Sequence, residues 1–371
     1  MRTIRLFLRK LLIKTPGVWG QSIILPRIRY VYDRLPFASY RAKQYAANEA
    51  KKIRSLVQTR DPIFTVVYDC DTLGISYGSL LNMLAIARYV ISNGGSVKFV
   101  IVDTESLDDV DERSPSYVRY MIEDFVKISM TLLDDKSSDV RIVSPASLSE
   151  IIQSQDSTNT LFYEFMSARR PFFRDCFNVF NNLMATAPRA IQNRTLFTFS
   201  DFEEYFPTSF TSKQYVAWHC RYDLRGTDYG RQTTKDEFLY SYNYLRRRFP
   251  NHDIIIISDR LGCQHYSSLA SILQIDDILF SKEYSFDFLG DAALIMNSDF
   301  FYWFRGGGVS QLGLVSRIPF EMLGPLMNEA MWNKRCLTSW QGDSQRFVVL
   351  KKHQFVYDRS LDIDKIGSDY L

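Results

Sequence analysis

The chain has 371 residues and nearly balanced charges, with 45 Lys and Arg against 42 Asp and Glu, so its formal net charge is +3. This balance argues against a dedicated nucleic-acid-binding protein, whose binding domain is usually strongly basic. Hydrophobic residues make up 46% of the chain and charged residues 23%, which excludes wholesale disorder. A chain of this length suggests about two or three domains with a sizeable core that needs no disulfides.

The basic residues are concentrated in residues 1–60, the N-terminal arm, which holds fourteen Lys and Arg but only two acids. The arm therefore has a net charge of +12, and the other 311 residues carry −9. Hydrophobic and basic residues alternate up to Thr15-Pro16-Gly17, which predicts a short amphipathic helix that stops there. Such a helix can lie in an anionic membrane interface, which would make residues 1–20 a membrane contact. Alternatively, the arm packs against the rest of the protein.

No spanning helix or secretory signal is predicted. The apolar runs of the arm are three residues long, too short for the h-region of a signal peptide. No other run approaches the ~18 apolar residues that cross a membrane. The cysteines are odd in number and form no CxxC pair, which argues against a zinc site or a disulfide framework. We therefore expect a cytoplasmic protein without a metal, peripheral on the inner membrane face if the arm binds there. The cysteines are Cys70, Cys176, Cys220, Cys263 and Cys336.

Short β-rich runs alternate with helical patterns after the arm, which is typical of βαβ units. A turn-rich loop, Asp69–Gly78, follows the first predicted strand, and Asn93-Gly94-Gly95 ends the first predicted helix. The elements predicted in this half are a strand at 64–68, a helix from an N-cap at Ser79 to about Ser92, a strand at 97–102, a helix at 115–133, a strand at 140–143, and a mostly helical stretch at 146–190.

The second half repeats the alternation and includes four consecutive isoleucines at 254–257, as expected for a buried parallel strand. Its predicted elements are strands at 215–218, 254–257, 277–280 and 299–304, and helices from a cap at Thr234 to about Arg248, at 264–273, at 286–296 and after Gln311. This pattern predicts an α/β fold with two doubly wound domains divided near 195–212. The predicted parts are the arm 1–60, a first α/β domain 61–200, a second α/β domain 201–345 and a tail 346–371.

Three predicted loops of the second domain follow strands, and ligands of open α/β sheets gather at the carboxyl ends of strands. The first loop holds two arginines, which suit a diphosphate because guanidinium groups form paired hydrogen bonds with phosphate oxygens. Arg and Asp at this spacing are also typical of a surface salt-bridge cluster. The residues of this loop are His219, Arg221, Asp223, Arg225 and Asp228.

The second loop, Ser258-Asp259, places an acid where it can accept hydrogen bonds from a ribose or a base edge. Ser and Asp are also common helix caps. The third loop has three glycines, which let the backbone approach a ligand, and N–H groups at the following helix can hold phosphate. A glycine run can also be only a tight turn. The residues of the third loop are Arg305, Gly306, Gly307, Gly308, Val309, Ser310 and Gln311.

Several other nucleotide and hydrolase motifs are absent from the sequence. There is no GxxxxGK[ST], which argues against a P-loop NTPase, and no GxGxxG after the first strand, which argues against a dinucleotide-binding dehydrogenase. There is also no GxSxG elbow of a serine hydrolase.

The order of these motifs resembles the fucosyltransferase superfamily of GT-B glycosyltransferases, which includes the α1,2-, α1,6- and protein O-fucosyltransferases. The resemblance lies in the His219-x-Arg221 strand end, the Ser258-Asp259 strand end, the stretch 288–312 with its acid, aromatic run and Ser-containing loop, and the segment 73–89. It covers roughly residues 62–102 and 213–320. Two positions depart from the family pattern: Tyr222 stands where a second arginine is common, and Leu224 where an acid is expected.

The resemblance implies a GT-B fold with two Rossmann-like domains facing across a cleft, an N-terminal acceptor-side domain 61–200 and a C-terminal nucleotide-sugar-binding domain 201–345. It also implies an inverting, metal-independent glycosyl transfer. GDP-fucose is the best single donor, and the acceptor is a glycan or a lipid-linked oligosaccharide. No cofactor is expected, since the nucleotide sugar is a substrate. The implied roles are diphosphate stabilisation by Arg221 and Arg225, phosphate binding by the N–H groups of 307–310 and the Ser310 hydroxyl, nucleoside orientation by Asp259, and general-base catalysis by Asp71 or Asp69.

Two alternatives remain open at the level of sequence. Another nucleotide-dependent transferase, such as a sulfotransferase, would have a similar phosphate loop. A catalytically degenerate GT-B fold would bind glycans without nucleotide affinity, which the departures at Tyr222 and Leu224 favour.

Overall fold

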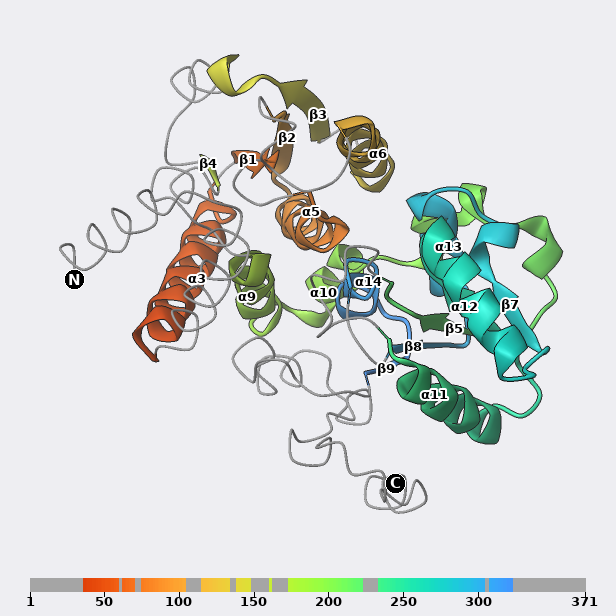
Figure 1. Cartoon of the computed structure of the whole chain (residues 1–371). Helices are drawn as coiled ribbons and strands as arrows, with labels where there is room; N and C mark the ends of the chain where they lie inside the picture. Colours follow the sequence, from red (N-terminus) through yellow and green to blue (C-terminus); the bar gives the residue numbers. More distant parts are fainter. Residues whose placement is uncertain are drawn as a thin grey trace.

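The computed structural model has two α/β units side by side, one built on β1–β4 and the other on β5–β9 (Figure 1). In both units every strand pairing is parallel. The strands of the first sheet come from residues 63–161 and those of the second from 215–322. The residues that the structure describes are 36–59, 62–70, 75–104, 115–133, 138–147, 160–161, 173–222, 233–303 and 307–322.

The first sheet has the order β3-β2-β1-β4. Its central strands are β1 (Ile63–Asp69) and β2 (Ser96–Val102), which are buried along most of their length because they are rich in Val, Ile and Phe. The edge strands are β3 (Ser138–Val143) and the two-residue β4 (Thr160–Leu161). The prediction of a mostly helical stretch at 146–190 was therefore wrong at 160–161, where β4 pairs with β1.

The helices of the first unit pack on one face of this sheet and share its apolar core. Three valines of β1 and β2 form a separate buried cluster on the opposite face (Val67, Val100 and Val102). The helices are α3 (Pro36–Leu56), α5 (Tyr77–Ser92), α6 (Pro115–Leu132), α9 (Phe173–Met184) and α10 (Arg189–Thr195).

Helix α5 begins three residues earlier than predicted, with Ser76 rather than Ser79 as its N-cap. Ser79 is instead fully buried inside the helix. The helix is buried on almost all sides because it contacts the sheet, α9, α10 and the second unit. Its end at Asn93 is confirmed, and Gly94 adopts a φ of 85°, the left-handed conformation that glycine tolerates best.

The second sheet has the order β7-β6-β5-β8-β9, so the strand order reverses between β5 and β8. Such a reversal is the topological switch point at which doubly wound sheets bind ligands. The strands are β5 (Tyr215–His219), β6 (Asp253–Ile257), β7 (Ile278–Phe280), β8 (Phe300–Trp303) and β9 (Phe320–Met322). The predicted fold class, α/β with two Rossmann-like units, is confirmed.

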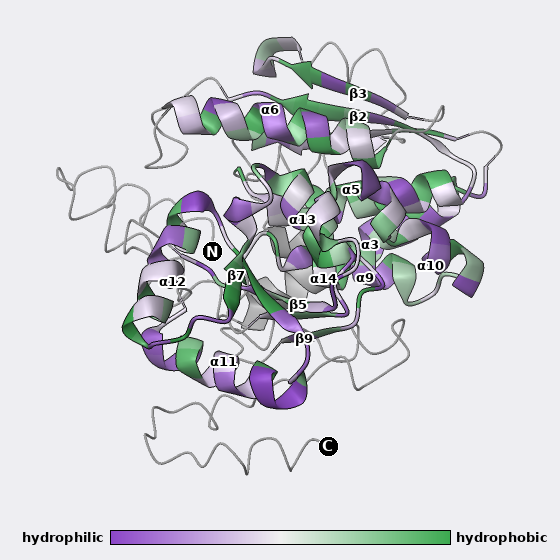
Figure 2. Cartoon of the chain, turned by 90° about the vertical axis from the view of Figure 1, so that its right-hand side faces the viewer, coloured by the Kyte–Doolittle hydropathy of each residue, from purple (hydrophilic) through white to green (hydrophobic). Residues whose placement is uncertain are grey.

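Alternate residues of β5 and β6 enter different cores. Val216 and Trp218 pack with α11 (Lys235–Arg248) and α12 (Arg260–Ile272). Ala217 packs with α13 (Phe288–Met296) and α14 (Gln311–Leu314) in the core that continues into the first unit. The turns at the two ends of α11 are hydrophilic, whereas β2 and β7 are largely hydrophobic (Figure 2).

The boundaries of the helices follow from their caps. Thr234 and Glu237 form a reciprocal capping box at the start of α11, which confirms the predicted N-terminus. The prediction that the next helix begins at 264 was wrong, because Asp259 caps α12 by accepting a hydrogen bond from Gly262.

The segment between the two sheets ties both units together. It contains three 3-10 turns, Phe199–Asp201, Glu203–Tyr205 and Thr208–Phe210. Arg88 of α5 forms an ion pair with Asp201 at 2.8 Å, and the N–H of Phe197 donates to the carbonyl of Val315, just after α14. The units are therefore joined by a packed segment.

Candidate functional site

The switch point of the second sheet brings His219 and the glycine loop together. His219 ends β5 and lies between Ile257 of β6 and Trp303 of β8 in the strand register. A Cβ atom built on Gly307 would lie only 2.7 Å from Nε2 of His219 and 3.6 Å from Cδ of Arg221. Gly307 does not adopt a left-handed φ. The need for glycine is therefore spatial, because no side chain fits against the imidazole.

The hydrogen bonding of His219 fixes which ring nitrogen carries the proton. Nδ1 lies 3.0 Å from the carbonyl oxygen of Ile257, which can only accept, so Nδ1 is the donor and Nε2 is an acceptor. Burial, the largest effect, lowers the pKa of His219 to about 4. The ring is therefore neutral near pH 7.

Nε2 of His219 is buried and has no hydrogen-bond partner within the described part of the chain. A buried acceptor left unsatisfied costs about 1–3 kcal/mol. The position faces the glycine loop at the carboxyl edge of the sheet, where a ligand hydroxyl or N–H group could donate to it. This is the strongest sign of a ligand site in the described residues.

The buried imidazole predicts an acid-sensitive second unit. Unfolded His219 binds a proton below about pH 6.5, whereas the folded protein binds it only below about pH 4. The contribution of His219 to the free energy of unfolding is therefore complete above about pH 6.5. It is lost as the pH falls towards 4, by up to about 3 kcal/mol. Urea unfolding at pH 7.0 and 4.5 should show a smaller difference for His219→Gln than for the wild type. His265→Gln is the control, because that side chain is exposed. Equal pH dependence in wild type and His219→Gln would contradict the prediction.

Ser310 closes the glycine loop from within. Its hydroxyl donates to the carbonyl of Gly307 at 2.6 Å and accepts from the N–H of Gly307 at 3.1 Å. The Ser310 side chain is fully buried. The Ser310 hydroxyl and the Gly307 N–H are therefore hydrogen-bonded to each other within the loop. Phosphate contacts from this segment would come from the N–H groups of Gly308 and Val309.

The glycine loop also contacts the first unit. A Cβ on Gly308 would lie 3.1 Å from the backbone nitrogen of Gly78 and 3.2 Å from Cβ of Tyr77, at the start of α5. Gln311 accepts a hydrogen bond from Asn82 of α5 at 3.4 Å. Because α5 follows the carboxyl end of β1, the carboxyl edges of both sheets face the same junction. Asp69, which ends β1, is buried.

A cluster that the sequence did not indicate lies next to this contact. The Tyr77 hydroxyl donates to Asp124 of α6 at 2.6 Å, and its ring stacks on Phe288 of α13 with centroids 4.4 Å apart. Burial raises the pKa of Asp124, although the bond from Tyr77 opposes this. Lys127 pairs with Asp287 at 2.7 Å. In the sequence only the spacing of Asp124 and Lys127 on one face of a predicted helix is visible, which by itself does not indicate a site.

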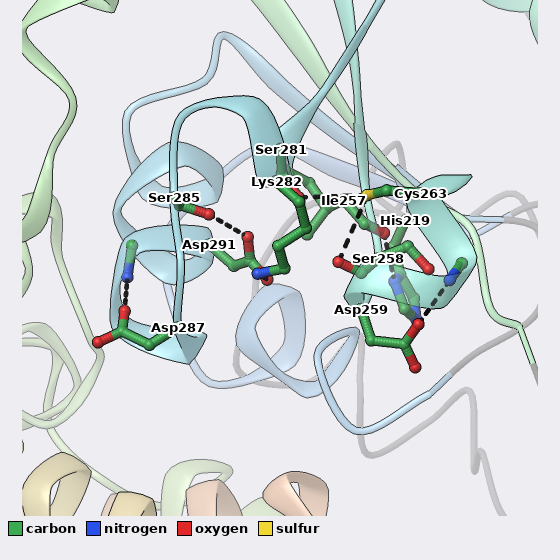
Figure 3. A network of polar contacts seen from close by, with 12 residues as sticks. His219, Ile257, Ser258, Asp259, Cys263, Ser281, Lys282, Ser285, Asp287 and Asp291 are labelled. Carbon is green, nitrogen blue, oxygen red and sulfur yellow. Dashed lines mark hydrogen bonds and ion pairs between the residues drawn. The ribbon is translucent and has the colours of Figure 1, made fainter. Parts of the chain in front are cut away.

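The second predicted loop has local structural partners. The buried Ser258 hydroxyl donates to the carbonyl of Cys220 at 2.7 Å, which joins the ends of β6 and β5. Asp259 is exposed and caps α12 through one carboxylate oxygen, with Gly262 as donor at 2.7 Å (Figure 3). The other carboxylate oxygen of Asp259 lies at the same carboxyl edge of the second sheet as His219.

The structure thus gathers part of the predicted site. The predicted residues that it brings to the junction are His219, Arg221, Gly307, Gly308, Ser310 and Gln311. Six predicted residues lie outside the described part of the chain, as do residues 1–20. The six are Asp71, Asp223, Arg225, Asp228, Arg305 and Gly306.

No three of the His, Cys, Asp and Glu side chains of the described residues come together as metal ligands would. Among the helices in the described part of the chain, none has the length and apolar character needed to cross a membrane.

No protein-family model and no curated protein matches the chain. Three solved structures are similar to it: E. coli heptosyltransferase WaaC with ADP (11% identity, TM-score 0.44, covering 78% of this chain and 93% of that one), a glycosyl transferase of family 9 from Veillonella parvula (10%, 0.45, 82% and 88%), and UDP-GlcNAc 2-epimerase from Neisseria meningitidis bound to UDP-GlcNAc (10%, 0.39, 83% and 90%). At these identities and TM-scores the likeness says nothing about activity, and the fold assignment comes from the strand order itself.

Proposed function

We propose that the protein is a glycosyltransferase that moves a sugar from a nucleotide-diphosphate donor to a glycan hydroxyl, with inversion and without a metal. GDP-fucose is the donor that the sequence motifs favour. The observation that carries the proposal is the neutral His219, whose buried acceptor nitrogen faces the glycine loop at the switch point beside Arg221. A hydroxyl-rich nucleotide sugar supplies both the donor for this nitrogen and the phosphates for the arginine.

In this proposal the protein acts by charge and position. Arg221 and Arg225 stabilise the negative charge that develops on the departing diphosphate. The N–H groups of Gly308 and Val309 hold the phosphates, and Asp259 orients the nucleoside. A carboxylate at the end of β1, Asp69 or Asp71, removes the proton from the acceptor hydroxyl as general base. The basic arm, residues 1–20, would hold the enzyme on an anionic surface near lipid-linked acceptors.

Arg221→Ala tests the donor site. Loss of a group that stabilises charge in the transition state typically lowers kcat by about 10²–10³-fold, and we expect a fall of this size in sugar transfer. The measurement is release of nucleoside diphosphate from a panel of nucleotide sugars. Arg247→Ala, which removes an exposed arginine from α11, is the matched control. Transfer by Arg221→Ala close to that of the wild type would refute this site.

One observation favours a second candidate, a glycan-binding module that has lost catalysis. Tyr222 stands where the family often has a second arginine, and its ring stacks on His265 with centroids 4.5 Å apart. The position is thus used for packing. Thermal shifts separate the candidates, because a transferase should be stabilised selectively by GDP or UDP, a sulfotransferase by adenosine 3′,5′-bisphosphate, and the module by no nucleotide.

A further inference from the structure

One face of α6 carries a stripe of polar and aromatic side chains that runs along the junction of the two units. The spacing of Tyr117, Tyr120, Asp124, Lys127 and Thr131 places them on the same side of the helix. The stripe therefore presents one continuous surface, whose two halves have different surroundings.

The C-terminal half of the stripe contacts the second unit and the segment between the sheets, while the Lys127 side chain stays 48% exposed. Lys127 pairs with Asp287 at 2.7 Å, and its ammonium lies 5.0 Å from the ring centroid of Tyr205. Thr131 is hydrogen-bonded to the Tyr205 hydroxyl at 3.2 Å. This half of α6 is thus docked against the N-terminus of α13 and the segment between the sheets.

The N-terminal half of the stripe is exposed and aromatic. Tyr117 is 42% exposed and Tyr120 is 47% exposed, with ring centroids 6.4 Å apart. Phe286, which precedes the Asp287 partner of Lys127, is 85% exposed. Burial, followed by the charges of Asp124 and Asp287, raises the pKa of Tyr120, which places this phenol near both carboxylates. We call Tyr117 and Tyr120 the aromatic platform.

The aromatic platform is linked to the glycine loop through two side chains, Asp124 and Tyr77. Asp124 follows Tyr120 on the stripe and accepts a hydrogen bond from Tyr77. The Cβ atom of Tyr77 in turn lies 3.2 Å from where a Cβ on Gly308 would be. A ligand on the platform would therefore extend along α6 towards the proposed donor loop.

The chemistry of the platform suits a neutral sugar chain better than an anion. Ring faces are electron-rich and attract the C–H edges of pyranose rings, while phenol hydroxyls and carboxylates hydrogen-bond to sugar hydroxyls. The cations near the platform already have partners: Lys127 pairs with Asp287, Lys282 with Asp291, and Arg119 with Asp103. A phosphate or sulfate would therefore meet no unpaired cation among these residues.

We propose that Tyr117 and Tyr120 form the binding platform for the acceptor, an uncharged oligosaccharide. This rests on the proposed glycosyl transfer for its purpose, since a transferase must hold its acceptor beside the donor loop. The binding itself depends only on the geometry and chemistry of the platform.

The test is saturation-transfer NMR with the full chain and tetrasaccharides of glucose, N-acetylglucosamine, mannose and galactose, with a sulfated heparin tetrasaccharide as the anionic probe. We expect saturation transfer to at least one neutral probe, and at least about tenfold weaker binding by Tyr117→Ala/Tyr120→Ala, as for the loss of central aromatic contacts. Tyr120→Phe should retain most of the binding. Ile272→Ala, which removes an exposed side chain of α12, should bind like the wild type.

Three results would overturn the platform: no saturation transfer to any neutral probe, equal binding by the double variant, or preference for the heparin probe. Protection of residues 116–124 from hydrogen exchange by GDP or UDP alone would assign the patch to closure of the two units, and would also overturn it. GDP and UDP binding, measured on the same samples, keeps the two proposals apart. Nucleotide binding without a platform effect refutes only the platform, and a platform effect without nucleotide binding refutes only the transferase.

Discussion

Gly307→Ala should reduce sugar transfer by about 100-fold or more while the protein stays folded. The added Cβ would meet Nε2 of His219 at 2.7 Å, a distance that real Cβ contacts essentially never show, so the loop or the imidazole must move. Displacement of a site by about 1 Å can cost about 10²-fold in rate. Because Ser310 ties the loop to Gly307 through both of its hydroxyl hydrogen bonds, a shift at Gly307 also moves the N–H groups assigned to the phosphates.

A double-mutant cycle makes this prediction specific. His219→Ala removes the imidazole and leaves room for the new methyl group. Gly307→Ala should therefore cause little further loss of nucleotide binding in the His219→Ala background, whereas independent sites would show additive losses. Calorimetric titration of the nucleoside diphosphate and the melting temperature of each variant are the measurements. Additive losses, or wild-type transfer by Gly307→Ala, would show that the imidazole and the loop do not form one site.

Much of the fold could be predicted from local patterns. Runs such as the four isoleucines of β6 are typical of buried parallel strands, and Thr234 with Glu237 is a capping box that can be read from spacing alone. Alternation of such elements predicts parallel α/β units. The two-residue β4 could not be predicted, because it is too short to show a period and is held only by pairing with β1.

The misplaced start of α5 has a tertiary cause. Ser76 and Ser79 are equally good caps by residue type, and the choice depends on Tyr77 and Gly78 fitting against Gly308. That contact joins segments far apart in the chain.

The candidate site was predictable only where it lies on strand ends. His219, Arg221 and the glycine loop follow predicted strands, and the switch point explains why they meet. Asp124 could not be assigned from the sequence, because its significance comes from the bond to Tyr77, 47 residues away, and from the second unit packed beside α6. Pairs of this kind depend on how two domains dock, which periodicity does not encode.

Asp291→Ala should lower the free energy of unfolding by about 3–5 kcal/mol, the usual cost of breaking a buried ion pair from one side. The Asp291 carboxylate is buried in α13 and accepts from Lys282 at 2.5 Å and from the Ser285 hydroxyl at 2.6 Å (Figure 3). Burial raises the pKa of Asp291, while the two donors oppose that change. Removing the carboxylate leaves the ammonium of Lys282, whose side chain is only 15% exposed, without this ion-pair partner.

The comparison that decides this prediction uses a second variant and a surface pair. Lys282→Met/Asp291→Leu removes both charges, so it should recover most of the stability lost in Asp291→Ala, because hydrophobic replacement of a buried pair is often neutral. Asp139→Ala breaks the pair with Arg141, which has a similar distance of 2.7 Å but side chains that are 40% and 64% exposed, and should cost no more than about 1 kcal/mol. Urea unfolding of the three variants measures these differences. If Asp291→Ala and Asp139→Ala cost the same, burial does not govern the Lys282–Asp291 pair. If the double variant is as unstable as Asp291→Ala, the loss comes from packing in α13 rather than from the stranded charge.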